Sequence, residues 1–105
     1  MIPSPVLPEL DYWCNAKGFP RAFDEVLRNV RRGALLVEQV VDDDYERILE
    51  LRSQYRDLRV GFVDAAVLAI VERLGETRLA TLDRRHFSVM RPRHVAALEL
   101  LPATR

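Results

Sequence analysis

The sequence predicts an α/β fold, with a short parallel sheet covered by helices in a single domain. Its 105 residues fit one domain at the small end of the usual size range. Hydrophobic residues make up 49% of the chain and charged residues 30%, a balance typical of a folded globular protein. Apolar segments with helical spacing alternate with short apolar runs, and strands separated by helices favour parallel pairing with crossover connections.

Four helices are predicted from the spacing of apolar residues and from the residues that end each pattern. The first covers residues 5–17 and ends before Gly18. The second covers residues 20–32, and the third opens at Asp42-Asp43-Asp44. The fourth covers residues 62–74 and is apolar almost all round, so we expect it to be buried on more than one side.

Three strands are predicted, at residues 34–41, 78–82 and 97–101. The chain therefore opens directly with a helix. Three short strands make a narrow sheet for four helices to cover, so we expect that a strand of the complete fold is missing before the first helix.

The overall charge is zero, which by itself predicts no nucleic-acid partner. The C-terminal segment from residue 78 onward is nevertheless basic, with Arg78, Arg84, Arg85, Arg91, Arg93 and Arg105 against Asp83 and Glu99. Such a patch is compatible with phosphate contact, although a solvated surface explains it as well.

Cys14 is the only cysteine, which excludes a disulfide framework and a thiolate zinc site. The N-terminus has no basic region followed by an apolar run, so no signal peptide is expected. The longest apolar run, residues 65–71, is far too short to span a bilayer. These features predict a cytoplasmic protein without a membrane partner.

Three carboxylates stand where ordinary surface charges are not expected. Glu9 lies among apolar residues of the first helix, Asp64 in the first turn of the most buried helix, and Asp83 directly after a strand. Ligands of open parallel sheets bind beyond the carboxyl ends of the strands, where Asp83 lies. Clustered carboxylates repel by about 4 kcal/mol per pair at ~4 Å and an effective dielectric of ~20, so a cluster favours a bound cation. Mg²⁺ and Mn²⁺ suit such all-carboxylate sites.

Each carboxylate also has a structural interpretation. Asp64 can be a helix N-terminal carboxylate favoured by the helix dipole, Asp83 can cap a turn, and Glu9 can face solvent. The sequence by itself does not show that the three lie close together.

Two segments resemble the C-terminal motifs of PIN-domain ribonuclease toxins of the VapC type: Phe62-Val63-Asp64-Ala65-Ala66 and Thr81-Leu82-Asp83-Arg84-Arg85-His86-Phe87. Residues 4–10 resemble the segment that holds the conserved glutamate of this family, and residues 91–102 match its closing run. The resemblance implies a PIN-like three-layer α/β/α fold with a short parallel sheet over residues 1–105. That domain is incomplete at its N-terminus, because the family's first, central strand and its aspartate are missing, and the sheet is then expected to be split.

The resemblance also implies the chemistry. Glu9, Asp64 and Asp83 would be metal ligands for Mg²⁺ or Mn²⁺, and Thr81 would orient them. The implied activity is that of a Mg²⁺-dependent endoribonuclease toxin of a type II toxin–antitoxin system, which hydrolyses RNA phosphodiester bonds with a metal-activated water.

The resemblance further implies three kinds of partner: an RNA substrate, a cognate antitoxin and a second copy of the chain in a homodimer. The arginines expected to hold RNA phosphates are Arg84, Arg85, Arg91 and Arg93.

Two alternatives follow from the same residues. Without the family's first aspartate the site has three acidic ligands instead of four, which favours a truncated, catalytically inactive PIN-like module that retains antitoxin-binding or dimerisation surfaces. The other is a response-regulator-like α/β domain with a Mg²⁺-binding acidic cluster, although the turn at residues 82–87 argues against it.

Overall fold

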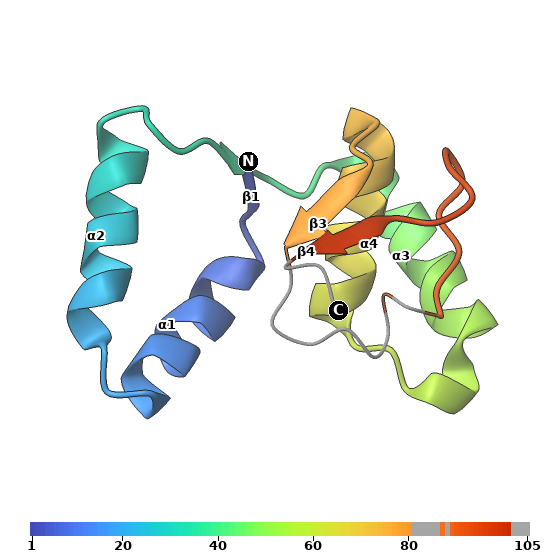
Figure 1. Ribbon diagram of the computed structural model, residues 1–105. Helices are drawn as coiled ribbons and strands as arrows, with labels where there is room; N and C mark the ends of the chain where they lie inside the picture. Colours follow the sequence, from blue (N-terminus) through green and yellow to red (C-terminus); the bar gives the residue numbers. More distant parts are fainter. Residues whose placement is uncertain (81–86, 88, 102–105) are drawn as a thin grey trace. The chain divides into compact units, whose positions relative to one another are not determined.

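The computed structural model describes residues 1–80, 87 and 89–101. The chain divides into two compact units, Met1–Val40 and Val41–Arg105, and each is described by itself. Both units combine helices with a pair of short strands (Figure 1).

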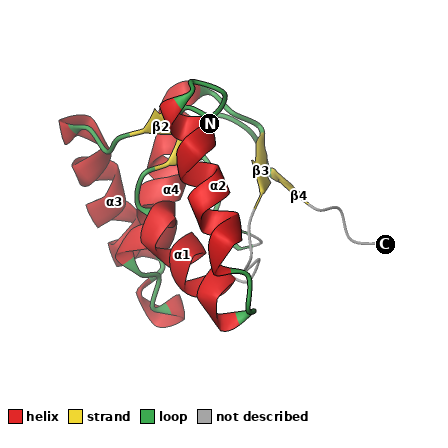
Figure 2. Ribbon diagram, turned by 90° about the vertical axis from the view of Figure 1, so that its left-hand side faces the viewer, coloured by secondary structure: helices red, strands yellow, loops and turns green. Residues whose placement is uncertain are grey.

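The first unit contains β1 (Ile2–Pro3), α1 (Val6–Ala16), α2 (Pro20–Arg31) and β2 (Val37–Glu38). The helices α1 and α2 pack side by side as a hairpin (Figures 1 and 2). Gly18 allows the sharp turn between them because it adopts a positive φ of 83°. Pro20 then begins α2 at a position where a missing N–H costs nothing.

The strand β1 corrects the expectation that the chain opens with a helix and supplies only three strands. β1 and β2 pair in parallel, with Ile2 opposite Val37. The N–H groups of Ile2 and Ser4 donate to the carbonyl oxygens of Leu36 and Glu38 at 2.7 and 2.8 Å. Pro3 has no N–H, but it lies between these two donors and interrupts neither bond.

The second unit contains α3 (Asp42–Gln54), the short 3-10 helix η1 (Arg56–Leu58), α4 (Phe62–Leu74), β3 (Arg78–Ala80) and β4 (Glu99–Leu101). α3 packs against α4. Residues 65–71 of α4 are all buried, and Ile48 and Leu51 of α3 are buried with them. The predicted bounds and the burial of α4 are therefore confirmed, and Gly75 ends the helix at φ 69°.

Two ion pairs fasten α3 to α4. Asp44 is only 3% exposed, and its Oδ1 lies 3.1 Å from Nε of Arg73. Nε of Arg47 lies 2.7 Å from Oε1 of Glu72. The Asp44 carboxylate also accepts the N–H of Val41 at 3.0 Å, and so caps the start of α3.

The described strands form two separate parallel pairs, β1 with β2 and β3 with β4. This confirms the predicted α/β class and the short parallel sheet, while the division of one sheet into two parts stays a prediction. The packing of the elements into three layers and the assignment of one domain remain predictions. Within the described part of the chain, no helix combines the length and apolarity that crossing a membrane requires.

Candidate metal centre

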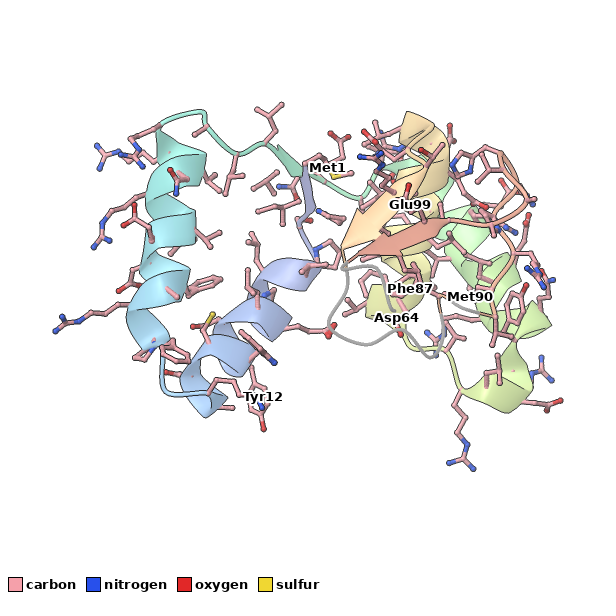
Figure 3. The ribbon with its side chains drawn as sticks, in the orientation of Figure 1. Met1, Tyr12, Asp64, Phe87, Met90 and Glu99 are labelled. Carbon is pink, nitrogen blue, oxygen red and sulfur yellow. The ribbon has the colours of Figure 1, made fainter. Side chains whose placement is uncertain are left out.

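Asp64 is held at one end of the buried helix of the second unit. α4 follows Gly61, whose extended backbone lets the first turn begin, and Gly61 accepts the N–H of Ala65 at 3.2 Å. Asp64 lies in this first turn and is half-buried, and the fully buried stretch of α4 starts at the next residue (Figure 3). Its carboxylate therefore stands at the border between core and surface, on a rigid element suited to hold a ligand in place.

Glu9 lies at the corresponding place in the first unit. It is in the first turn of α1, which begins at Val6, and it is exposed. A first-turn carboxylate interacts favourably with the positive end of the helix dipole. This interaction stabilises Glu9 and Asp64 without a metal, so their placement alone does not assign them as ligands.

The remaining predicted site residues follow the end of β3. β3 ends at Ala80, directly before Thr81. Thr81, Asp83, Arg84 and Arg85 lie outside the described residues.

Glu9 belongs to the first unit and Asp64 to the second. The meeting of the three carboxylates therefore stays a prediction. Among the described residues, no group of three or more His, Cys, Asp and Glu side chains could hold a metal ion.

The chemistry of the predicted donor set fits a hard divalent cation. Glu9, Asp64 and Asp83 offer only carboxylate oxygens, which Mg²⁺ and Mn²⁺ bind in preference to softer donors. Cys14, the one thiol, is buried in the first unit on the helix that carries Glu9. The residues therefore suit Mg²⁺ or Mn²⁺ better than a metal that prefers sulfur.

The two described arginines predicted to bind RNA differ in their surroundings. The guanidinium of Arg93 forms an ion pair with Glu50, and its backbone N–H donates to Glu72 at 2.6 Å. Arg91 uses its backbone N–H to donate to the Tyr55 hydroxyl at 2.8 Å, and its side chain is exposed. The charge of Arg93 is thus compensated within the protein, whereas Arg91 is more accessible to a phosphate.

A second basic site was not foreseen from the sequence. Arg52, Arg56 and Arg59 line a pocket beside the start of α4. The signal in the sequence was the i, i+4 spacing of Arg52 and Arg56, although in the structure α3 ends at Gln54 and Arg56 begins η1. It was overlooked because the stem of Arg52 fits the apolar stripe of α3 as well.

Comparison with known proteins places the chain in a class. The chain belongs to the PIN-domain family, because the family model for the PIN domain matches residues 1–92. That range contains Glu9, Asp64 and Asp83. Among curated proteins the chain is similar to Ribonuclease VapC26 of Mycobacterium tuberculosis (strain ATCC 25618 / H37Rv). The two are 34% identical over 93 residues, which cover 88% of this chain and 69% of the relative. The predicted membership of the VapC-type PIN proteins is confirmed.

Proposed function

We propose that the chain is a Mg²⁺-dependent endoribonuclease toxin of a type II toxin–antitoxin system and that it hydrolyses RNA phosphodiester bonds. One observation carries the proposal: the match to the PIN domain runs across all three candidate metal ligands. The similarity to a protein named a ribonuclease, over 88% of this chain, supports RNA as the substrate.

Each candidate residue has a definite role in this proposal. Glu9 and Asp64 present carboxylate oxygens from the first turns of α1 and α4. Asp83 completes the ligand set, and Thr81 orients it. A divalent cation bound there would lower the pKa of a water molecule and offset negative charge on the phosphate. Arg91 contacts RNA phosphates beside the site, together with Arg84, Arg85 and Arg93.

The proposed setting is the cytoplasm, where the RNA substrate is found. A cognate antitoxin keeps the toxin inactive, and a second copy of the chain forms a homodimer with it. The resemblance of residues 62–66 and 81–87 to the motifs of VapC-type toxins supports a toxin–antitoxin pair.

The test is cleavage of a single-stranded RNA by the full chain in the presence of Mg²⁺. We expect cleavage that EDTA abolishes and that Asp64→Asn reduces strongly. The matched control is Asp43→Asn, since Asp43 is an exposed carboxylate in the first turn of α3. Cleavage that persists in Asp64→Asn would contradict the assigned site.

The alternative function is an inactive PIN-like module that retains antitoxin-binding or dimerisation surfaces, and the three-ligand set favours it. Titration with Mg²⁺ separates the two. An inactive module shows no Mg²⁺-dependent change in thermal stability and no cleavage, yet it still binds the antitoxin or forms a dimer. A nuclease shows both the stability change and the cleavage.

A further inference from the structure

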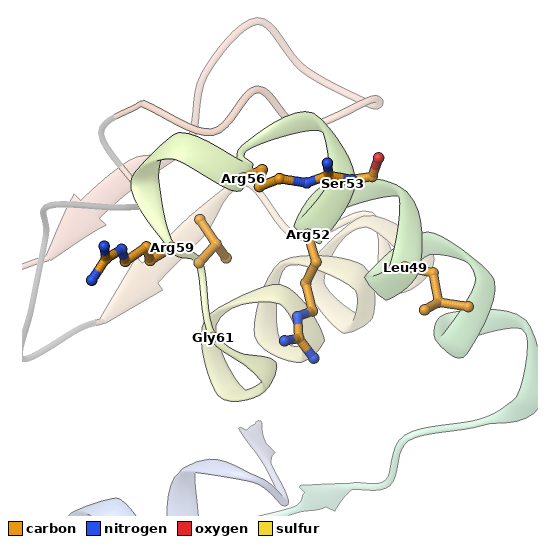
Figure 4. Close-up of a pocket in the computed structure, with 7 residues that line it drawn as sticks. Leu49, Arg52, Ser53, Arg56, Arg59 and Gly61 are labelled. Atoms are coloured by element: carbon orange, nitrogen blue, oxygen red, sulfur yellow. The ribbon is translucent and has the colours of Figure 1, made fainter.

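A basic pocket lies in the second unit, between the end of α3 and the start of α4. Its volume of about 490 Å³ lies in the range of pockets that hold small organic ligands, so a nucleotide-sized group fits. The lining comes from the last turns of α3, from η1 and from the connection to α4 (Figure 4). Its charged lining residues are Arg52, Arg56 and Arg59.

The charges of these arginines are not compensated within the described part of the chain. Arg52, Arg56 and Arg59 are exposed, and none of them forms a hydrogen bond or an ion pair through its side chain with a described residue. Asp57 lies between two of them in the sequence, but it does not line the pocket. The pocket therefore concentrates positive charge and favours an anionic ligand.

The backbone of Arg59 adopts a left-handed conformation where it ends η1. Its φ is 53°, in the left-handed region, and it is the only described residue other than glycine with a positive φ. Glycine or asparagine adopts this conformation at lower cost. The turn that ends η1 therefore places Arg59 in the lining of the pocket at a small conformational cost.

The pocket is close to the predicted metal centre along the chain. Gly61 lines the pocket and also begins α4, and Asp64 follows in the first turn. Three residues of helix rise only about 4.5 Å, so a ligand in the pocket lies near the end of α4 that carries the candidate metal ligand.

The arrangement of the charges fits a chain of phosphates better than a single ion. In Figure 4 the guanidinium groups of Arg52 and Arg59 lie on opposite sides of the segment at Gly61 and point in different directions. Spread charges of this kind match the repeated phosphates of a single strand. Leu49 and Val60 are the only lining residues with large apolar side chains. The pocket therefore offers little apolar surface against which the hydrophobic side chains of a protein partner could pack.

We propose that Arg52, Arg56 and Arg59 bind the sugar–phosphate backbone of single-stranded RNA next to the cleaved bond. This inference rests on the proposed ribonuclease function, because it assigns the binding path of that substrate. It adds a second set of phosphate contacts, on the α3–α4 side of Asp64, to the arginines of the C-terminal segment.

The test measures binding without cleavage. Full-length chain is titrated into a fluorescein-labelled RNA of about 12 nucleotides, a length that such grooves cover, in EDTA and at several salt concentrations. The pocket variant combines Arg52→Gln, Arg56→Gln and Arg59→Asn. The control variant combines Lys17→Gln, Arg21→Gln and Arg31→Gln, which removes the same charge from exposed positions of the first unit. Circular dichroism confirms that each variant folds.

The expected result is a loss of affinity of about tenfold or more in the pocket variant and less than about threefold in the control. The slope of log affinity against log salt should fall by about 2 in the pocket variant, since each lost phosphate contact to a single strand removes about 0.7. Equal losses in both variants, or no loss in the pocket variant, overturn the inference.

Two further measurements separate this inference from its rivals. If an acidic peptide binds the wild-type chain but not the pocket variant, and RNA binding is the same for both, the pocket serves an acidic protein segment and the inference fails. Mg²⁺-dependent cleavage with an unchanged KM in the pocket variant also overturns it, while the proposed ribonuclease function stands. Loss of RNA affinity in a chain that cleaves nothing supports the pocket and removes the nuclease function instead.

Discussion

Arg47 of α3 and Glu72 of α4 form a bidentate ion pair, with Nε–Oε1 and Nη2–Oε2 distances of 2.7 and 2.9 Å. Their side chains are only 11% and 8% exposed. The hydrogen bonds that Arg47 donates to Glu72 raise the pKa of Arg47 against the opposing effect of burial. Glu72 also accepts the backbone N–H of Arg93, so one carboxylate joins α3, α4 and the segment before β4.

Removal of Arg47 should therefore destabilise the second unit strongly. We expect Arg47→Met to lower the free energy of unfolding by about 3 kcal/mol, because Glu72 is left buried without its charged partner. The measurement is urea unfolding followed by circular dichroism. The double variant Arg47→Met/Glu72→Met should lose less than Arg47→Met alone, since it leaves no unpaired buried charge.

An exposed ion pair on α2 serves as the control for the buried pair of Arg47 and Glu72. Arg28 and Glu25 lie 2.9 Å apart on α2, with side chains 63% and 55% exposed. Arg28→Met should cost at most about 1 kcal/mol, because water and salt screen such pairs. A loss from Arg47→Met that is no larger than this would show that the α3–α4 pair contributes little to stability.

Replacing Asp44 should lower the stability of the chain much more than replacing either of its neighbours, Asp42 and Asp43. Asp44 pairs with Arg73 and caps Val41, whereas Asp42 and Asp43 are exposed. We expect Asp44→Ala to cost about 2–4 kcal/mol, through the lost cap at Val41 and the lost ion pair of a buried carboxylate.

Asp43→Ala serves as the control for Asp44→Ala and should change stability by about 0.5 kcal/mol. Thermal unfolding of the two variants measures the difference. Equal effects would mean that Asp44, like Asp43, acts only through the helix dipole.

The fold shows what local patterns can and cannot predict. α4 was predicted to its end residues because an apolar helix closed by Gly75 carries its signal within one stretch of chain. β1 was missed because a strand of two residues that includes Pro3 has no local signal, and it exists only through its pairing with β2. The triple aspartate predicted the start of α3, but the burial of Asp44 depends on Arg73, far away in the sequence.

For the candidate site, too, local patterns predict the residue types but not how distant residues come together. Motifs predict Glu9, Asp64 and Asp83 as candidate metal ligands, because each stands in a recognisable local setting, and this assignment stays a prediction. Their meeting depends on how elements far apart in sequence pack, which no local pattern contains. Arg59 was missed for the same reason, because only the turn from η1 into α4 brings it to the pocket that Arg52 lines.

Removal of the metal should be visible in stability as well as in activity. A cation that binds only the folded state adds about 2.7 kcal/mol when its concentration is a hundred times its Kd. We therefore expect Mg²⁺ to raise the melting temperature of the wild-type chain and EDTA to reverse the shift. Asp64→Asn should abolish the shift and lower cleavage by at least about a hundredfold, since it removes one ligand of the ion. A full Mg²⁺ shift in Asp64→Asn would remove Asp64 from the ligand set.

Arg59 should show opposite effects on stability and on RNA binding. Its φ of 53° is strained for an arginine, and glycine relieves that strain. We expect Arg59→Gly to stabilise the chain by about 1 kcal/mol, the scale of the left-handed penalty, while it weakens RNA binding several-fold. Thermal melts and fluorescence anisotropy on the same preparation measure both. Asp57→Gly, at an ordinary helical position of η1, should destabilise the chain instead. A variant Arg59→Gly that gains stability and keeps full RNA affinity would show that the arginine has no part in binding the substrate.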